Sequence, residues 1–214
     1  MHSAVLAAMY SALALLARGR PADARARVHD AQSHWSRTGF HVQHLHALKL
    51  EVACDLYEQR PHDAWARIVA TWTALEDSNF LRISARRSEA LILRARAALA
   101  VYRRSPGEHA HLLDVVEMDA GQLAQENRTH LSAEAALLRA GLAACKGDAA
   151  ASTRHLGAAV SGFEAANMHL SAIAVRRLRA TKDVDIARQD ALMRMQDIGD
   201  PVAWTRVVAP GLVS

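Results

Sequence analysis

The sequence predicts an all-α protein in which helical hairpins stack into a superhelix. Three observations support this prediction. Alanine is abundant, whereas glycine (10) and proline (5) are scarce and fall where helices would end. The phrase RPADARARV, which begins at Arg20, returns forty residues later as RPHDAWARI from Arg60. Apolar residues recur in both copies at the spacing of one helical face.

The repeated phrase belongs to a longer block that occurs three times. Setting Pro21 on Pro61 places Phe40 on Phe80, and a third copy begins at Gly147. Each copy carries mostly apolar residues at positions i, i+4 and i+7: Ala24, Val28 and Ala31; Ala64, Ile68 and Thr71; Ser152, Leu156 and Ala159. Each block is therefore expected to form one amphipathic helix.

Proline and left-handed residues mark the ends of these helices. Pro21 and Pro61 suit a first helical turn, where the missing N–H group has no intrahelical partner. Gly39, Asn79 and Asn167 suit the left-handed position that stops a helix. We therefore expect a turn after each copy of the block.

Longer and more apolar helices lie between the blocks, so the repeating unit is a helix, a turn and a second helix. The sequence predicts five such hairpins, over residues 2–38, 40–77, 80–126, 129–166 and 168–197, and a short helix near 200–208. A single pair cannot bury its apolar face, but stacked pairs can. No glycine- or serine-rich linker divides the 214 residues, so one domain, 1–214, is expected.

Two resemblances narrow this architecture. Gly19, Ala24, Val28 and Ala31 resemble the second helix of a tetratricopeptide (TPR) repeat, although the period of 40 to 45 residues exceeds the usual value of about 34. Residues 129–211 resemble the C-terminal TPR-like region of bacterial multidomain regulators that carry serine/threonine kinase and AAA-type ATPase domains. The features of that match are Leu138-Arg139-Ala140-Gly141, Gly147-Asp148, Phe163-Glu164-Ala165-Ala166, Met168, Arg176-Arg177, Gln196, Ile198, Pro201 and Ala209-Pro210-Gly211. The resemblance implies a sensory or scaffold tail of a signalling regulator.

The charges are unevenly distributed along the chain. The formal net charge is +4, but residues 82–104 hold seven arginines and one acid, and residues 105–126 hold five acids and no lysine or arginine. If the two segments are the arms of one hairpin, they largely neutralise each other. We prefer that interpretation to a nucleic-acid-binding surface on the Arg82–Arg104 helix, which stays as an alternative function.

Cysteine content and hydropathy indicate a cytoplasmic protein without a membrane segment. Cys54 and Cys145 fall inside apolar helical runs and are expected to be buried thiols, as in a reducing compartment. No stretch approaches the ~20 apolar residues that span a bilayer. The most apolar segment, residues 4–17, has no lysine or arginine before it, which disfavours a signal peptide.

No catalytic or metal motif stands out in the sequence. It lacks a phosphate-binding glycine loop, the kinase motifs and a nucleophile elbow, so we expect no enzyme and no cofactor. A fragment of a kinase/ATPase whose catalytic domains lie elsewhere stays a further alternative. His41 and His44, one turn apart, could bind zinc with His62 or Asp63, but they lack the usual i, i+4 spacing, so surface histidines are expected instead.

The favoured function is a non-catalytic protein–protein interaction module. Helical repeats form an extended groove, which in TPR-type proteins is lined by the first helix of each pair. The partner would be a protein or peptide, which could be the kinase/ATPase part of a larger regulator. Six residues are candidate partner contacts: His41, His44, Arg82, Arg86, Arg176 and Arg177.

Overall fold

The computed structural model describes residues 2–33, 35 and 39–213, and this part of the chain is helical without any strand. The α-helices are α1 His2–Ala17, α2 Pro21–Ser33, α3 Val42–Tyr57, α4 Pro61–Asp77, α5 Ser84–Arg104, α6 Leu112–Gln125, α7 Thr129–Cys145, α8 Ala149–Ala165, α9 His169–Arg179, α10 Asp183–Arg194 and α11 Pro201–Val208; a 3-10 helix, η1, spans Phe80–Arg82. The all-α prediction is confirmed. No helix within the described residues is long and apolar enough to cross a membrane.

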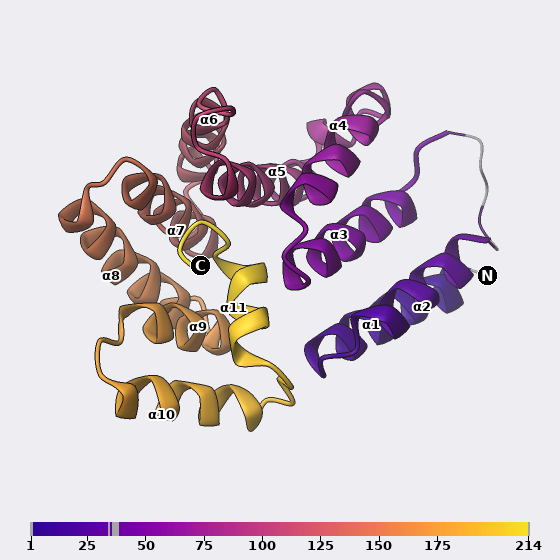
Figure 1. Ribbon diagram of the computed structural model, residues 1–214. Helices are drawn as coiled ribbons and strands as arrows, with labels where there is room; N and C mark the ends of the chain where they lie inside the picture. Colours follow the sequence, from indigo (N-terminus) through magenta and orange to yellow (C-terminus); the bar gives the residue numbers. More distant parts are fainter. Residues whose placement is uncertain (1, 34, 36–38, 214) are drawn as a thin grey trace.

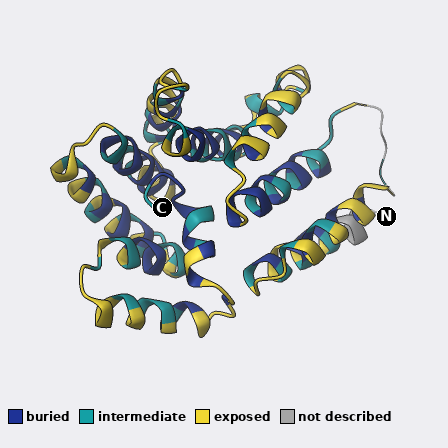
Figure 2. Ribbon diagram, viewed as in Figure 1, coloured by how far each residue is buried: buried dark blue, intermediate teal, exposed yellow. Residues whose placement is uncertain are grey.

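The helices form two layers that curve together (Figure 1). Each helix packs on the next along the chain, and α1, α3, α5 and α7 also pack side by side as an inner layer. The second helix of each hairpin lies outside this layer. Figure 2 shows the consequence, because the buried surface concentrates on α3, α5 and α7, whereas α4, α6 and α10 expose one face.

Local chemistry sets the helix ends as predicted. Pro21 and Pro61 are the first residues of α2 and α4. Gly39, Asn79 and Asn167 all have positive φ values, 75°, 61° and 57°. A left-handed residue directs the chain out of the helix and lets the next helix fold back.

The repeated phrase places an ion pair in the first turn of α2 and of α4. Arg20 Nε lies 2.7 Å from Asp23 Oδ2, and Arg60 Nε lies 3.7 Å from Asp63 Oδ2. The acids stand at the positive end of the helix dipole, which favours them there. The repeat thus preserves the helix start as well as the buried face.

The buried faces of the repeats agree with the prediction at every position except Thr71. The other apolar or small residues at i, i+4 and i+7 are buried. Thr71 is half-buried, and its hydroxyl donates to the carbonyl oxygen of Arg67 at 2.8 Å. The hydroxyl at this position borders the space between α2, α3 and α4 and bonds to its own helix.

The third hairpin differs most from a simple pair of continuous helices. It begins with η1, and its second helix, α6, begins only at Leu112 although α5 ends at Arg104. Pro106 and Gly107 favour a turn, and the first buried side chain after Val101 is Leu112. The end of the first predicted hairpin, residues 34 and 36–38, lies outside the described residues.

Helix α11 returns to the inner face and packs on α3 as well as on α9 and α10 (Figure 1). The segment before it meets the first hairpin, where the Gly199 N–H donates to the carbonyl oxygen of Ala17 at 2.8 Å. A Cβ atom at Gly199 would lie 2.5 Å from the Arg18 carbonyl oxygen, so only glycine permits this approach. The fifth hairpin and the first are thereby joined.

The two cysteines are free thiols. Cys54 is buried as predicted, but Cys145 is only half-buried because it ends α7. Burial raises the pKa of Cys54 to about 12 and also raises the pKa of Cys145. Neither thiol is activated by its surroundings.

Candidate partner-binding groove

An apolar groove of about 630 Å³ runs along the inner face between α1, α3 and α5. Its apolar lining includes Met9, Tyr10 and Leu13 from α1, Leu50 and Ala53 from α3, Ile92 and Leu93 from α5, and Val207 from α11. Tyr10 and Leu13 are 69% and 42% exposed, which is unusual for large apolar side chains on an inner helix. The groove therefore presents apolar surface to water.

Helical periodicity builds the two long walls of this groove. Residues at positions 46, 49, 50, 53 and 56 of α3 line it, as do positions 86, 89, 92, 93 and 96 of α5. Both sets recur every three or four residues and so mark one stripe along each helix. Because α3 and α5 pack side by side, the two stripes form a continuous seam.

Charged groups at one part of the seam carry a positive excess. Lys49 Nζ lies 3.3 Å from Glu89 Oε1, and Arg86 Nη1 lies 3.1 Å from Glu89 Oε2. Two cations thus share one carboxylate. Beside them, burial and the neighbouring Lys49 lower the pKa of His46, which keeps the imidazole neutral at pH 7. This part of the groove therefore carries a net positive charge.

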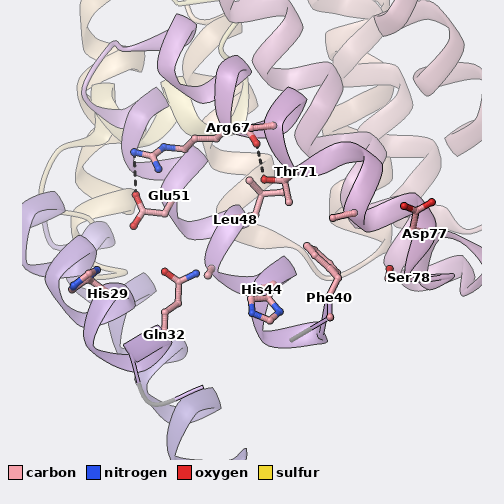
Figure 3. A pocket seen from close by; sticks show the side chains of 14 residues that line it. His29, Gln32, Phe40, His44, Leu48, Glu51, Arg67, Thr71, Asp77 and Ser78 are labelled. Atoms are coloured by element: carbon pink, nitrogen blue, oxygen red, sulfur yellow. Dashed lines mark hydrogen bonds and ion pairs between the residues drawn. The ribbon is translucent and has the colours of Figure 1, made fainter. Parts of the chain in front are cut away.

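A second groove opens on the outer side, between α2, α3 and α4 (Figure 3). Its volume is about 1010 Å³, and Figure 3 shows Leu48 and His44 of α3 between His29 of α2 and Thr71 of α4. Ala47 and Leu48 lie on α3, whereas most of the residues on α2 and α4 are polar or alanine. It is more polar than the inner groove.

A buried ion network holds α2 and α4 against α3 at one side of the outer groove. Asp55 is fully buried; Arg25 Nη2 donates to its Oδ1 at 2.7 Å, and Arg67 Nε donates to its Oδ2 at 2.6 Å. Glu51 accepts from Arg25 at 2.6 Å and lies 3.5 Å from Arg67. Burial lowers the pKa of Arg25, but hydrogen bonds to Glu58 and Asp55 outweigh that effect and raise it. These side chains pair with one another, so their charges are largely neutralised within the protein.

The predicted contact residues do not form one site. Arg86 lines the inner groove, but His44 lines the outer groove, and Arg82 lies exposed in η1 and lines neither. The N–H of His41 donates to His44 Nδ1 at 2.8 Å, and their rings stack with centroids 5.7 Å apart. This histidine pair therefore organises the start of α3.

Arg176 and Arg177 have carboxylate partners within the last two hairpins. Arg176 pairs with Glu164, and Arg177 Nε donates to Asp190 Oδ1 at 2.6 Å. His46, which was not among the candidates, enters the inner groove instead. Its position four residues before Leu50 places both on one face of α3, and that spacing was the available signal.

The predicted neutralisation between the two arms of the third hairpin is confirmed in part, because two arginines of α5 pair with acids of the 105–126 segment. Arg94 makes two hydrogen bonds to the buried Asp119, at 2.9 and 2.5 Å, and Arg87 pairs with Glu126. Burial raises the pKa of Asp119 although Arg94 opposes the shift. Arg96 reaches Glu134 of α7 at 2.8 Å, and Glu117 of α6 lies near Arg139 rather than facing α5. This pairing removes much of the reason for a nucleic-acid surface on α5.

No group of three or more histidine, cysteine, aspartate or glutamate residues in the described part of the chain could hold a metal ion. Comparison of the chain with protein-family models, curated proteins and solved structures finds no match.

Proposed function

We propose that this chain is a non-catalytic protein–protein interaction module whose inner groove binds an amphipathic helix of a partner. The main support for this proposal is the position of helix α11. This helix lies on the inner face against α3 and α9, and its Val207 also lines the groove. The surface that continues from this intramolecular helix is apolar along α3 and α5, as a groove that receives an amphipathic helix is.

The groove specifies the chemistry of the partner. Met9, Leu13, Leu50 and Ile92 would contact an apolar stripe at i, i+3 or i+4 spacing. Lys49 and Arg86 share only Glu89, so an acidic residue on the partner helix would meet an incompletely neutralised pair of cations. Burial of apolar surface would supply affinity, and the charges would set the orientation.

The resemblance of residues 129–211 to regulator tails supports a wider role. In this proposal the chain is the sensory or scaffold part of a bacterial cytoplasmic signalling regulator, and its partner is the kinase/ATPase part or a protein that part acts on. The two unactivated thiols are consistent with a reducing compartment. The chemistry of signalling would then belong to other domains.

Photo-crosslinking combined with matched variants tests the groove. A photo-reactive amino acid at Leu13 should crosslink a partner in cells, whereas one at Val69, exposed on α4, should not. The crosslinked protein is then purified, and its affinity is measured by fluorescence anisotropy. Tyr10→Asp combined with Leu13→Asp should weaken binding at least about tenfold, because charge replaces the apolar contact at the centre of the interface.

The control carries the same chemical change elsewhere on the surface. Val69→Asp combined with Met118→Asp also replaces two exposed apolar side chains, on α4 and α6, and neither residue lines the inner groove. This variant should bind like the unmodified protein. Equal loss of binding in the two double variants, or a crosslink that forms from Val69 and not from Leu13, contradicts the proposal.

A further inference from the structure

A smaller cavity of about 230 Å³ lies at the other end of the α3–α5 seam, and three arginines line it. Leu56 of α3 borders both this cavity and the inner groove. Arg103 and Arg104 come from the last turn of α5, and Arg206 comes from α11. No acidic residue is among its described lining residues, and Pro61, Ala100 and Pro210 contribute apolar walls.

These arginines differ from the other arginines around the seam. Arg94 and Arg96 each bind a carboxylate with two hydrogen bonds. By contrast, the side chains of Arg103 and Arg104 are exposed and make no hydrogen bond or ion pair with another described residue. Arg206 Nη2 donates to the Tyr57 carbonyl oxygen at 3.3 Å, but its buried Nε has no partner within the described chain. The exposed guanidinium groups of Arg103 and Arg104 therefore keep their donors available to a ligand, whereas the Arg206 Nε is enclosed by the protein and the rest of its guanidinium borders the cavity.

Helix dipoles account for only part of this arrangement. The C-terminal end of a helix carries roughly half a negative charge and favours basic residues in its last turn. That explains an arginine at the end of α5, where Arg103 and Arg104 lie. It does not explain why a third arginine comes from α11 to the same cavity without any acid. The full charges exceed the dipole charge, so the local potential is positive.

We infer that this cavity binds a small organic phosphate, with the phosphate held by Arg103, Arg104 and Arg206 and a short apolar body against Leu56 and Pro210. Arginine forks match phosphate oxygens and form charge-assisted hydrogen bonds with them. The volume equals that of about eight water molecules at ~30 Å³ each, which limits the ligand to a small molecule or one phosphorylated side chain. The inference does not depend on partner binding in the inner groove.

Isothermal titration calorimetry at fixed salt tests the site with defined probes. Phenyl phosphate, inorganic phosphate and benzoate are titrated into the full chain, which carries any purification tag at its N-terminus so that Pro210 and Val213 stay unaltered. Phenyl phosphate should bind most tightly, because it supplies both a doubly charged phosphate and an apolar body. Inorganic phosphate lacks the ring, and benzoate carries a single charge, so each should bind more weakly.

Matched charge variants locate the binding. Arg103→Ala combined with Arg104→Ala should weaken phenyl phosphate binding at least about tenfold, because charge-assisted hydrogen bonds are lost. Arg154→Ala combined with Arg188→Ala removes the same charge from exposed positions on α8 and α10 and should change the affinity less than about twofold. Circular dichroism confirms that all variants stay folded.

The outcomes distinguish phosphate binding in this cavity from nonspecific electrostatic attraction to the protein. Loss of binding in the Arg103/Arg104 variant alone supports the site. Equal weakening in both double variants, equal affinity for phenyl phosphate and inorganic phosphate, or no heat from phenyl phosphate at millimolar concentration overturns it. A phosphotyrosine peptide that competes with phenyl phosphate would assign the ligand to a protein side chain, and failure to compete would assign it to a free small molecule.

Discussion

In the fourth hairpin, α7 and α8 approach each other most closely where a glycine meets an alanine, whereas in the first two hairpins arginines of α2 and α4 reach across to a buried aspartate of α3. A Cβ atom built at Gly162 would lie 2.8 Å from the Cβ of Ala133, so the fourth hairpin has no spare space there. In the first two hairpins, Arg25 and Arg67 span to the buried Asp55. The two regions share the helical repeat but differ in the side chains that join neighbouring helices.

This difference decides where the molecule is closed and where it is open. Close contact between small residues lets two helices approach and seals the interface. In the first two hairpins, Arg25 and Arg67 reach a shared carboxylate, and the outer groove of about 1010 Å³ lies between α2, α3 and α4. The side chains at the contact, more than the repeat itself, therefore determine which layers keep a cleft.

Removal of Asp55 should produce the largest loss of stability. Asp55→Ala leaves Arg25 and Arg67 without their buried partner, and breaking a buried ion pair costs about 3 kcal/mol or more. We expect the lower end of that range, because both arginines keep Glu51 nearby. Urea unfolding followed by circular dichroism measures the change.

The control for this variant is an aspartate at the same groove. Asp77→Ala alters a residue that lines the outer groove but has no ion pair with the described residues. Its effect should stay within about 0.5 kcal/mol. If Asp55→Ala is as mild as Asp77→Ala, the network does not hold α2 and α4, and the contrast with the fourth hairpin fails.

A single methyl group should disturb the fourth hairpin by less, but still measurably. Gly162→Ala places its Cβ against the Cβ and backbone of Ala133, which cannot rotate away. Overpacking of this kind costs roughly 1–3 kcal/mol, and the better helix propensity of alanine offsets about 0.5–1 kcal/mol of it. Thermal and urea unfolding should both show a net destabilisation.

Two companion variants separate crowding from helix propensity. Gly157→Ala lies in the same helix, where a Cβ would meet nothing within 4 Å, so it should stabilise the protein by about 0.5–1 kcal/mol. Ala133→Gly should recover much of the loss when combined with Gly162→Ala, because it removes the opposing methyl group. Additive effects of these two substitutions would show that their side chains do not collide.

Local chemistry explains what the sequence predicted well. Pro21, Asn79 and Asn167 mark helix ends through backbone preferences that need no distant partner, and the structure has each of them in the predicted conformation. The pairing of Arg94 with Asp119 was also predictable, because the two residues belong to adjacent arms of one hairpin, whereas the partner of Arg96 on α7 was not. Asp200 and Pro201 likewise signal a helix start, and the Asp200 side chain accepts from the Ala203 N–H at 2.9 Å.

The position of that helix was not predictable, because its contacts join distant parts of the chain. The approach of Gly199 to Ala17 depends on the curvature summed over all five hairpins. The inner groove depends similarly on how α3 and α5 pack, and it brings the candidate Arg86 together with His46, which the sequence analysis did not name. His41 and His44 suggested a binding site because they lie one helical turn apart. In the structure, this spacing lets the His41 N–H donate to His44 at the first turn of α3.

Alkylation of the two thiols tests whether the hairpins open separately, because its rate reports local opening of the structure around each cysteine. Cys54 is buried on α3 beside the Asp55 network and has a pKa of about 12, so iodoacetamide at pH 8 should modify it far more slowly than the half-buried Cys145 of α7. In Asp55→Ala, Cys54 modification should accelerate by roughly a hundredfold, since about 3 kcal/mol of opening free energy is lost. Gly162→Ala should leave the Cys54 rate closer to that of the unmodified protein, because the strain arises in another hairpin. Mass spectrometry of timed samples gives both rates, and a uniform acceleration of the two cysteines in both variants would mean that the hairpins open together rather than layer by layer.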